Sequence, residues 1–213
     1  MKLMLKVLVV DDFPLIRRGV RELVIGGFQG AKIGEAGNFH EMLDLLRQKP
    51  WDVAVMDISM PGMNGLDALK QVKQEFPDLP VLIFSMHPEE QYAIRMLKAG
   101  ADGYLTKSSA PEELVNAIKK VHGGGKYVSH SLGEALAFTV KPGVEKDLHE
   151  LLSDREYQVL CLIGSGKTVG EIADTMNLSV TTISTYRARI LEKMHMKTNA
   201  ELTRYAIQNG LEE

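Results

Sequence analysis

The sequence predicts an α/β domain with a parallel five-stranded sheet, followed by a small all-α domain. Three observations indicate this division. Over the first 122 residues, short apolar runs alternate with amphipathic segments, which is typical of βαβ units around a parallel sheet. A stretch with three consecutive glycines and a Pro-Gly pair follows, as in a connector. From Leu151 onward only helical periodicity remains. A chain of 213 residues that is 45% hydrophobic has room for two compact domains.

Five short apolar segments are the predicted strands of the first domain, because strands covered on both faces are almost continuously apolar. They are residues 6–10, 32–35, 53–56, 81–84 and 103–105. Helix-period apolar residues predict five helices, at residues 14–25, 39–48, 65–76, 89–99 and 111–121. Ser109 and Glu112 have the spacing of a capping box, with Pro111 inside the first turn of the last helix. The predicted first domain is a (βα)5 unit over residues 1–122.

The remaining residues divide into a linker and a helical domain. Residues 123–146 are predicted to be a linker with one short helix near residues 132–138. Residues 147–213 are predicted to hold four short helices. One begins after Ser179, and the other three begin at pairs with capping-box spacing, which are Ser153/Glu156, Thr168/Glu171 and Thr198/Glu201. The second and third helices meet around residues 177–179, which predicts a helix-turn-helix.

Composition excludes several classes of protein. The single cysteine, Cys161, lies in an apolar run and is expected to pack in a core, as in a reducing compartment. Two aspartates at positions 11 and 12 interrupt any signal peptide, and no stretch approaches the roughly 18 apolar residues that span a bilayer. The six histidines lack metal-ligand spacing, which argues against a zinc site. We expect a cytoplasmic protein with no membrane segment.

Polar side chains follow four of the predicted strands. Asp11 and Asp12 follow the first strand and Asp57 the third, while Ser85 and Lys107 follow the fourth and fifth. Ligands of open α/β sheets bind at these carboxyl ends, and neighbouring first and third strands would bring the three carboxylates together. Their repulsion would be relieved by a hard cation such as Mg²⁺. With a hydroxyl and an ammonium nearby, the set suits phosphoryl transfer to Asp57. Any one of these acids alone is also compatible with a turn or cap.

Four blocks of the sequence resemble the receiver domain of two-component response regulators over residues 5–122. They are VLVVDDFP, VAVMDISMPGMNGL, VLIFSMH and KAGADGYLTKSSAPEEL. The resemblance implies a flavodoxin-like fold and a phosphoryl group that Asp57 accepts from a sensor histidine kinase. It also implies that Asp12 and Asp57 bind Mg²⁺ directly, that Asp11 binds it through water, and that the backbone carbonyl of Ser59 completes the protein ligands.

The resemblance also assigns a switch. Lys107 would pair with the phosphate, and Ser85 would swing toward it on activation, with Tyr104 following inward. Ser108 follows the lysine where many receivers have proline, so this peptide bond is expected to be trans. His87, like Ser59, occupies a position that tunes the lifetime of the phosphoryl group in this family; the direction stays open.

Two enzyme classes share single features with this chain and are disfavoured. GSGKT at residues 164–168 resembles the end of a nucleotide-binding P-loop, but Cys161 stands at the position of its first glycine and a helix precedes it. Phosphatases of the haloacid dehalogenase type need a second aspartate where this chain has Ser59. No enzymatic activity is expected beyond self-phosphorylation and slow autodephosphorylation.

The third helix of the second domain, expected over residues 180–194, has the pattern of a DNA-recognition helix. Ile183 and Ile190 lie on its apolar side, and the opposite side is small and largely polar, as entry into a major groove requires. The expected DNA-binding residues are Thr181, Thr182, Ser184, Thr185, Arg187, Ala188, Arg189, Lys193 and Lys197. Residues 151–213 contain seven Lys and Arg against eight Asp and Glu, so no basic field indicates nucleic acid.

The stretch from Leu151 to Leu202 resembles the LuxR/NarL-type helix-turn-helix over nearly its full length. Together, the two resemblances imply a NarL/FixJ-type response regulator that binds double-stranded DNA, as a homodimer when active. Two alternatives stay open. The first is a constitutive DNA-binding protein whose receiver only dimerises, and the second is a phosphorelay partner that binds proteins through its second domain.

Overall fold

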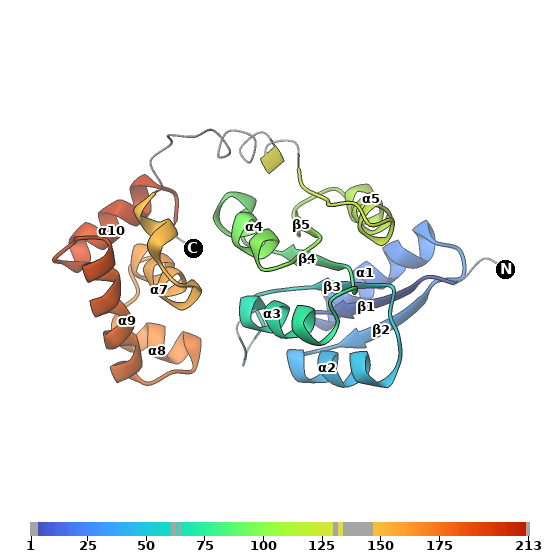
Figure 1. Ribbon diagram of the computed structural model, residues 1–213, viewed down its shortest axis with the longest axis horizontal. Coiled ribbons are helices and arrows are strands. Elements are labelled where there is room, and N and C mark those ends of the chain that lie inside the picture. Colours follow the sequence, from blue (N-terminus) through green and yellow to red (C-terminus); the bar gives the residue numbers. More distant parts are fainter. Residues whose placement is uncertain (1–3, 61–62, 64, 130–131, 134–146, 212–213) are drawn as a thin grey trace. The chain divides into compact units, whose positions relative to one another are not determined.

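The computed structural model describes residues 4–60, 63, 65–129, 132–133 and 147–211 (Figure 1). The chain forms two compact units, Met1–Phe138 and Thr139–Glu213, and their boundary falls within the predicted linker. Of the helices in the described part of the chain, none has the length and apolar character needed to cross a membrane.

Among its described residues, the first unit contains five strands, each parallel to its neighbours (Figure 1). They are β1 (Lys6–Val10), β2 (Lys32–Ala36), β3 (Val53–Met56), β4 (Val81–Ser85) and β5 (Gly103–Thr106). Their order in the sheet is β2-β1-β3-β4-β5, so β1 and β3 are neighbours. The predicted flavodoxin-like (βα)5 fold is confirmed, and every strand begins at the predicted residue.

Five helices cover the two faces of this sheet. They are α1 (Pro14–Gly27), α2 (Phe39–Gln48), α3 (Gly65–Glu75), α4 (Glu89–Lys98) and α5 (Pro111–His122). α1 and α5 lie on one face, and α2, α3 and α4 lie on the other (Figure 1). Val9 and Val55 of the sheet share a buried cluster with Val20 of α1 and Ile118 of α5. Since side chains alternate along a strand, the intervening residues face the other helices.

The start of α5 differs from the predicted capping box. The N-cap residue is Ala110, and no side chain caps the helix. Ser109 Oγ instead lies 3.0 Å from Thr106 Oγ1. Proline favours the first helical position, so Pro111 moves the cap one residue beyond Ser109 and removes the predicted spacing to Glu112.

The chain after α5 continues along the edge of the sheet instead of leaving it. Tyr127 forms a parallel bridge with Gly103 of β5. The Tyr127 amide donates to the Asp102 carbonyl (2.9 Å), and the Tyr104 amide donates to the Tyr127 carbonyl (3.1 Å). Residues 126–129, called here the edge segment, therefore extend the sheet beyond β5.

Two side-chain contacts hold the ends of the edge segment. Lys126 Nζ binds Asp102 Oδ1 at 2.8 Å. The Ser129 amide donates to Glu89 Oε1 (3.2 Å), and the Ser129 hydroxyl binds the same carboxylate. The first part of the predicted linker thus belongs structurally to the first unit. Of the helix predicted near residues 132–138, only Leu132 and Gly133 lie within the described residues, and both are helical.

The described part of the second unit contains one 3-10 turn, η1 (Leu148–Leu151), and the four predicted helices. These are α7 (Asp154–Gly164), α8 (Val169–Met176), α9 (Val180–Lys193) and α10 (Asn199–Gln208). Capping boxes begin α7 and α8, as predicted. Thr198 caps α10, but the Glu201 carboxylate binds the Lys197 amide instead of the cap residue. Asn177 has a left-handed backbone (φ 52°) that ends α8 and turns the chain toward α9.

Replacing Gly103 with alanine tests how closely the edge segment packs. A Cβ atom there would lie 2.9 Å from Cβ and the carbonyl oxygen of Tyr127, and 2.9 Å from Leu82 Cδ1. We expect Gly103→Ala to lower the free energy of unfolding by about 1 to 3 kcal/mol in urea denaturation. In the control, Gly19→Ala of α1, nothing lies within 4 Å of the new Cβ. Equal stability of the two variants would contradict the close packing.

Candidate functional site

The strand order brings the predicted acidic residues to one edge of the sheet. The backbones of Asp11 and Asp57 continue the strand ladders, since the Asp11 amide donates to the Ala36 carbonyl (3.1 Å) and the Asp57 amide to the Val10 carbonyl (2.9 Å). Both aspartates are buried, with exposed fractions of 2% and 3%. This edge lies at the reversal of strand order, where α/β sheets bind ligands.

Lys107 links the two buried carboxylates. Its Nζ lies 2.6 Å from Asp11 Oδ2 and 2.7 Å from Asp57 Oδ2. The other oxygen of Asp57 accepts hydrogen bonds from the amides of Ile58 (2.6 Å) and Ser59 (3.1 Å). The structure therefore gathers the predicted Asp11, Asp57 and Lys107 into one hydrogen-bonded group, with the Asp57 carboxylate held at both oxygens.

Burial and pairing shift the pKa values of this group in a consistent way. Burial raises the pKa of Asp11, and the hydrogen bonds from Lys107 and the Phe13 amide offset this only in part. Burial alone would lower the pKa of Lys107, but its hydrogen bonds to Asp11 and Asp57 outweigh burial and raise it. Lys107 is thus held as a cation, while Asp11 binds a proton more readily than an ordinary aspartate.

The site has the ligands for a divalent cation. One carboxylate oxygen from each of Asp11, Asp12 and Asp57 lies within 4.8 Å of the others. Asp12 Oδ1 is buried and has no hydrogen-bond partner among the described residues. A buried carboxylate oxygen without a donor is costly, and three carboxylates exceed the single charge of Lys107. Hard oxygen ligands with this charge fit Mg²⁺.

The predicted switch residues lie beside this site. Ser85 is fully buried, and its Oγ accepts a hydrogen bond from the His87 amide (3.3 Å). Tyr104 is also fully buried, and its hydroxyl donates to the His87 carbonyl (2.9 Å). Tyr104 thus occupies the inward position that the resemblance associated with activation. The described chain has no cis peptide bond, as predicted for Lys107 and Ser108.

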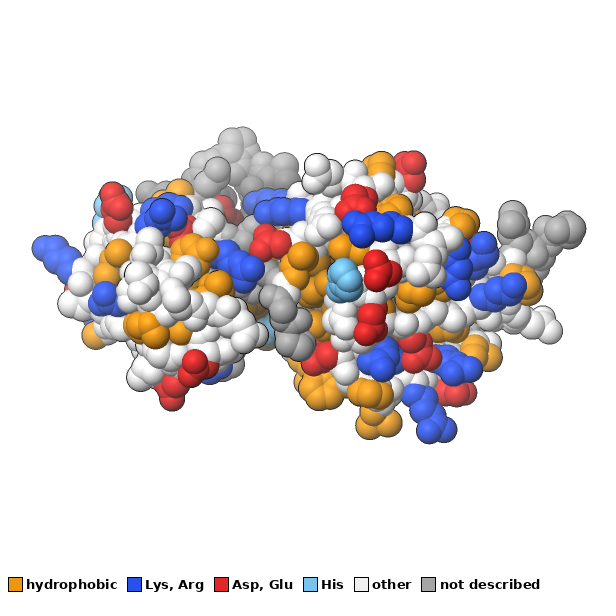
Figure 2. Space-filling view, turned by 90° about the horizontal axis from the view of Figure 1, so that it is seen from below, with side chains coloured by type: hydrophobic (Ala, Val, Ile, Leu, Met, Phe, Trp, Pro, Cys, Tyr) orange, Lys and Arg blue, Asp and Glu red, His pale blue; other side chains and the backbone are white. Residues whose placement is uncertain are grey.

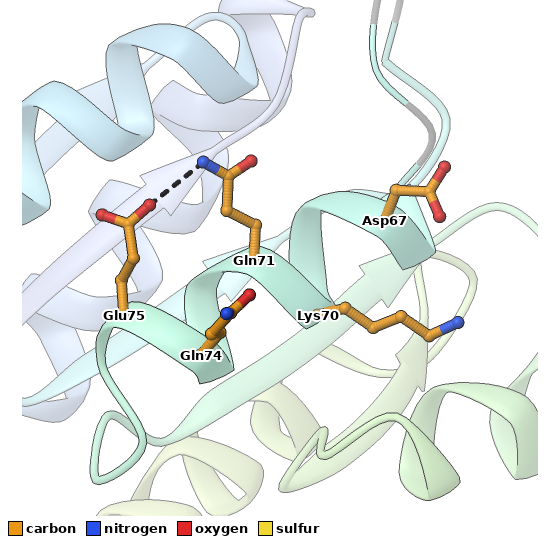
Figure 3. Close-up of a pocket in the computed structure, with 5 residues that line it drawn as sticks. All are labelled: Asp67, Lys70, Gln71, Gln74 and Glu75. Carbon is orange, nitrogen blue, oxygen red and sulfur yellow. Dashed lines mark hydrogen bonds between the residues drawn. The ribbon is translucent and has the colours of Figure 1, made fainter.

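A separate shallow pocket lies on the surface of α3. Its lining residues are Asp67, Lys70, Gln71, Gln74 and Glu75 (Figure 3). The Gln71 amide group donates to Glu75 Oε1 (3.0 Å), which also pairs with Arg47 of α2 at 2.9 Å. A pocket formed on one helix, whose carboxylate is already paired, is a weaker candidate than the buried acidic site.

In the second unit, α9 presents the two faces that the sequence predicted. Ile183, Ile190 and Met194 are buried at 1% exposure or less. The residues expected to approach DNA bases are exposed, and they are Thr181, Ser184, Thr185 and Ala188. On the visible face of this unit, basic side chains are separated by uncharged surface (Figure 2). α8 and α9 therefore form a helix-turn-helix whose exposed face consists of small residues.

The basic residues predicted to contact DNA fall into two groups. Arg189 and Lys197 are exposed. Arg187 Nε donates to Asn199 Oδ1, and Lys193 Nζ pairs with Glu156 Oε2 at 2.6 Å. Because Glu156 is buried, Lys193 joins α9 to the start of α7, and its role in DNA contact stays a prediction.

Sequence reasoning missed the contacts of Tyr127, Ser129 and Glu156. The three glycines before Tyr127 predicted a linker, although the run Lys126–Ser129 includes an aromatic and a β-branched residue that favour a strand. Glu156 was predicted only as half of a capping box. Its second partner, Lys193, is 37 residues away, beyond any local pattern.

Comparisons with known proteins agree with this geometry. Residues 7–119 match the family described as response regulator receiver domain, and residues 150–206 match bacterial regulatory proteins of the luxR family. Response regulator UvrY of Escherichia coli K12 is 35% identical, over 98% of this chain and 96% of that protein. Response regulator GacA of Pseudomonas syringae is 37% identical, over 98% of each.

A solved structure is similar over nearly the same length. It is RcsB from Salmonella enterica serovar Typhimurium, bound to promoter rprA in the presence of the phosphomimetic BeF3⁻. The TM-score is 0.67 and the identity 25%, with 94% of this chain and 98% of that chain covered.

Magnesium should stabilise the first unit through Asp12. A ligand that binds only the folded state adds about 2.7 kcal/mol at 100 times its Kd, so the thermal midpoint should rise with MgCl2. Asp12→Asn should lose most of this rise, because it removes a charged ligand, while the exposed Asp78→Asn should keep it. A rise of equal size in all three proteins would contradict the assigned site.

The pH dependence of this stabilisation follows from Asp11. Its pKa is raised in the folded protein, so as pH falls its proton competes with magnesium earlier than at an ordinary aspartate. The shift in thermal midpoint should therefore be full at neutral pH and decline before pH reaches the usual aspartate range of about 4. A shift that stays constant to pH 4 would contradict the role of Asp11.

The Glu156–Lys193 pair should stabilise the second unit. Burial raises the pKa of Glu156, but hydrogen bonds from Lys193 and Ser153 outweigh burial and lower it. Its contribution is therefore present above the unfolded-state pKa and is lost as pH falls through the folded-state value. Glu156→Gln should lower the free energy of unfolding by about 1 to 3 kcal/mol at pH 7. Lys193→Met should also destabilise the protein, whereas Lys197→Met should not; additive effects of Glu156→Gln and Lys193→Met would argue against the pair.

Proposed function

Because the chain belongs to the response regulators that join a receiver domain to a LuxR-type DNA-binding domain, we propose that a histidine kinase phosphorylates Asp57 and thereby controls DNA binding. One observation carries this proposal above the others. The Asp57 carboxylate is buried at the reversal of strand order, with the Lys107 ammonium 2.7 Å away and two further carboxylates beside it. An aspartate with a purely structural role would need neither two neighbouring carboxylates nor a place at the ligand-binding edge of the sheet.

The proposed reaction transfers a phosphoryl group from a phosphohistidine to Asp57. The P–N bond of the donor breaks as a bond forms between phosphorus and an Asp57 oxygen. The amides of Ile58 and Ser59 fix Oδ1, so Oδ2, beside Lys107, is the oxygen oriented for attack. Lys107 would then neutralise the phosphoryl oxygens, and the Ser85 hydroxyl would bind one of them. Mg²⁺ held by Asp11, Asp12 and Asp57, with the Ser59 carbonyl, would supply further charge neutralisation.

Phosphorylation can control a distant surface only if it favours one of two receiver conformations. A series of hydrogen bonds connects the phosphorylation site to the edge segment and could transmit such a conformational change. It leads from Ser85 Oγ to the His87 amide, and from the His87 carbonyl to the Tyr104 hydroxyl. The Tyr104 amide then binds Tyr127 of the edge segment, from which the chain leads toward the second unit. A movement of Ser85 toward phosphate would disturb this route at its first step.

The output that we propose is binding to double-stranded DNA as a homodimer. RcsB, whose structure is similar over 94% of the present chain, was solved on promoter DNA with a phosphomimetic. Helix-turn-helix dimers bind two half-sites, so receiver association would bring two α9 helices to one operator. DNA contact would come from the nine residues named for α9 and the following turn, with Arg189 and Lys197 at phosphates.

We further propose a cytoplasmic protein with no catalytic activity beyond self-phosphorylation and slow autodephosphorylation. In self-phosphorylation, the reactants would be its own Asp57 and a phosphodonor. The pair Asp57 and Ser59 lacks the second acid that a phosphatase would use.

A phosphodonor experiment tests the proposed function. Full-length protein is incubated with MgCl2 and acetyl phosphate, and DNA binding and sedimentation are measured before and after. We expect tighter binding and a larger dimer fraction for the wild type and for the exposed-site control Asp78→Asn, but no change for Asp57→Asn. A complete shift between 1:99 and 99:1 populations corresponds to about 5.5 kcal/mol of differential stabilisation.

Two outcomes would contradict the proposal. If wild type and Asp57→Asn bind DNA equally well in all conditions, the protein binds constitutively and the receiver only dimerises. If phosphorylation occurs but no DNA from a random pool is bound, the second unit recognises a protein partner.

A further inference from the structure

The first nine residues of α9 expose an unusual surface for a DNA-recognition helix. The exposed side chains in this half of the helix are Val180, Thr181, Ser184, Thr185 and Ala188. Val180, at the first helical position, is 55% exposed and is one of the few large hydrophobic residues on the surface of this unit. The N-terminal part of a recognition helix is the part that meets base edges. An apolar side chain is thus presented where bases are read.

The hydroxyl groups of two threonines are turned into the helix. Thr185 Oγ1 donates to the Thr181 carbonyl at 3.0 Å. Thr182 Oγ1 lies 2.8 Å from the Oγ of Ser179, the residue that caps α9. With its hydroxyl engaged by the backbone, Thr185 offers its methyl group outward. Val180, Thr185 and Ala188 therefore contribute methyl groups to one exposed surface, called here the methyl face.

Long polar side chains are missing from this half of the exposed face. Bidentate recognition of guanine requires Arg or Lys, and that of adenine requires Asn or Gln. Within α9, Arg187 is bound to Asn199 and Lys193 is paired with Glu156. Arg189 is exposed, but it follows the methyl face toward the C-terminal half of the helix. Hydrogen-bonded readout would rest on the short hydroxyls of Thr181 and Ser184.

We propose that the methyl face recognises the C5-methyl groups of thymine in the major groove, so that the operator half-site is selected for T·A pairs. The inference rests on the proposed DNA-binding function and specifies how it reads sequence. Thymine carries the one apolar group on the base edges of the major groove. Placing Val180 and Ala188 against a G·C pair would remove water from guanine acceptors without replacing its hydrogen bonds, which disfavours that pair.

Uracil substitution tests the proposal with the full-length protein. Half-sites are first selected from a pool of random double-stranded DNA, with acetyl phosphate and MgCl2 present. Each thymine of the selected half-site is then replaced singly by deoxyuridine, which removes only the methyl group, and Kd is measured at one salt concentration. We expect Kd to rise about fourfold at two or more positions of each half-site, the change typical of losing one buried methyl-sized group.

A matched pair of variants locates the contact on the protein. Thr185→Ser removes the outward methyl and keeps the hydroxyl that binds the Thr181 carbonyl, so neither fold nor cap is altered. Thr175→Ser in α8 removes a methyl outside α9 and keeps the hydroxyl that binds the Glu171 carbonyl (2.7 Å). Sensitivity to uracil at one position should disappear in Thr185→Ser and persist in Thr175→Ser. Arg189→Ala should weaken binding to thymine and uracil sites by the same factor, as for a phosphate contact.

The outcomes separate this inference from the proposed function. Recovery of no DNA would overturn DNA binding itself. Recovery of half-sites in which no deoxyuridine raises Kd by more than about 1.5-fold, well under the loss of one methyl group, would overturn methyl readout and leave DNA binding intact. Uracil sensitivity that is the same in Thr185→Ser as in the wild type would overturn the assignment of Thr185.

Discussion

The Lys107 ammonium between Asp11 and Asp57 is the interaction on which the rest of the first unit depends. Two buried carboxylates repel at low dielectric, and a cation between them offsets this repulsion. Lys107 reaches both because β5 ends at the same edge of the sheet as β1 and β3. One ammonium cannot neutralise three carboxylates. With Asp12 beside Asp11 and Asp57, the site therefore keeps an excess of negative charge that a bound cation would reduce.

The site combines two residues that the sheet backbone holds in place, Asp57 and Lys107, with two proposed switch residues, Ser85 and Tyr104. Asp57 and Lys107 are fixed through their backbones, because their amides continue the ladders to Val10 and Ser85. On the switch side, the Ser85 hydroxyl accepts a hydrogen bond from the His87 amide, and the Tyr104 hydroxyl donates one to the His87 carbonyl. A new anion on Asp57 would compete for the Lys107 ammonium and the Ser85 hydroxyl. The rearrangement should therefore spread along the His87 side, while the strands keep their places.

The sequence sufficed for those parts of the fold that local patterns determine. All five strands begin where continuous apolar runs predicted. Asp57 was placed at the sheet edge because it follows Val53–Met56 and because Asp11, Asp12, Ser85 and Lys107 follow other strands in the same way. The prediction that Ser109 caps α5 was wrong. Pro111 takes the first helical position, so the residue directly before it, Ala110, is the N-cap. The edge segment was missed for another reason: three glycines shortly before Tyr127 predicted a linker, although Tyr127 pairs with Gly103 of β5. Contacts between distant segments leave no periodic signal.

The charge of the second unit limits how it gains affinity for DNA. Its acidic and basic residues nearly balance, so no long-range field attracts DNA, and binding must depend on a few direct contacts. Lys193 is paired with Glu156, which further reduces the number of basic residues available to bind phosphates. A methyl face adds selectivity but little attraction. A single helix-turn-helix of this kind binds weakly, and joining two of them makes the second contact intramolecular. Dimerisation through the receiver would then change affinity far more than any contact made within one α9.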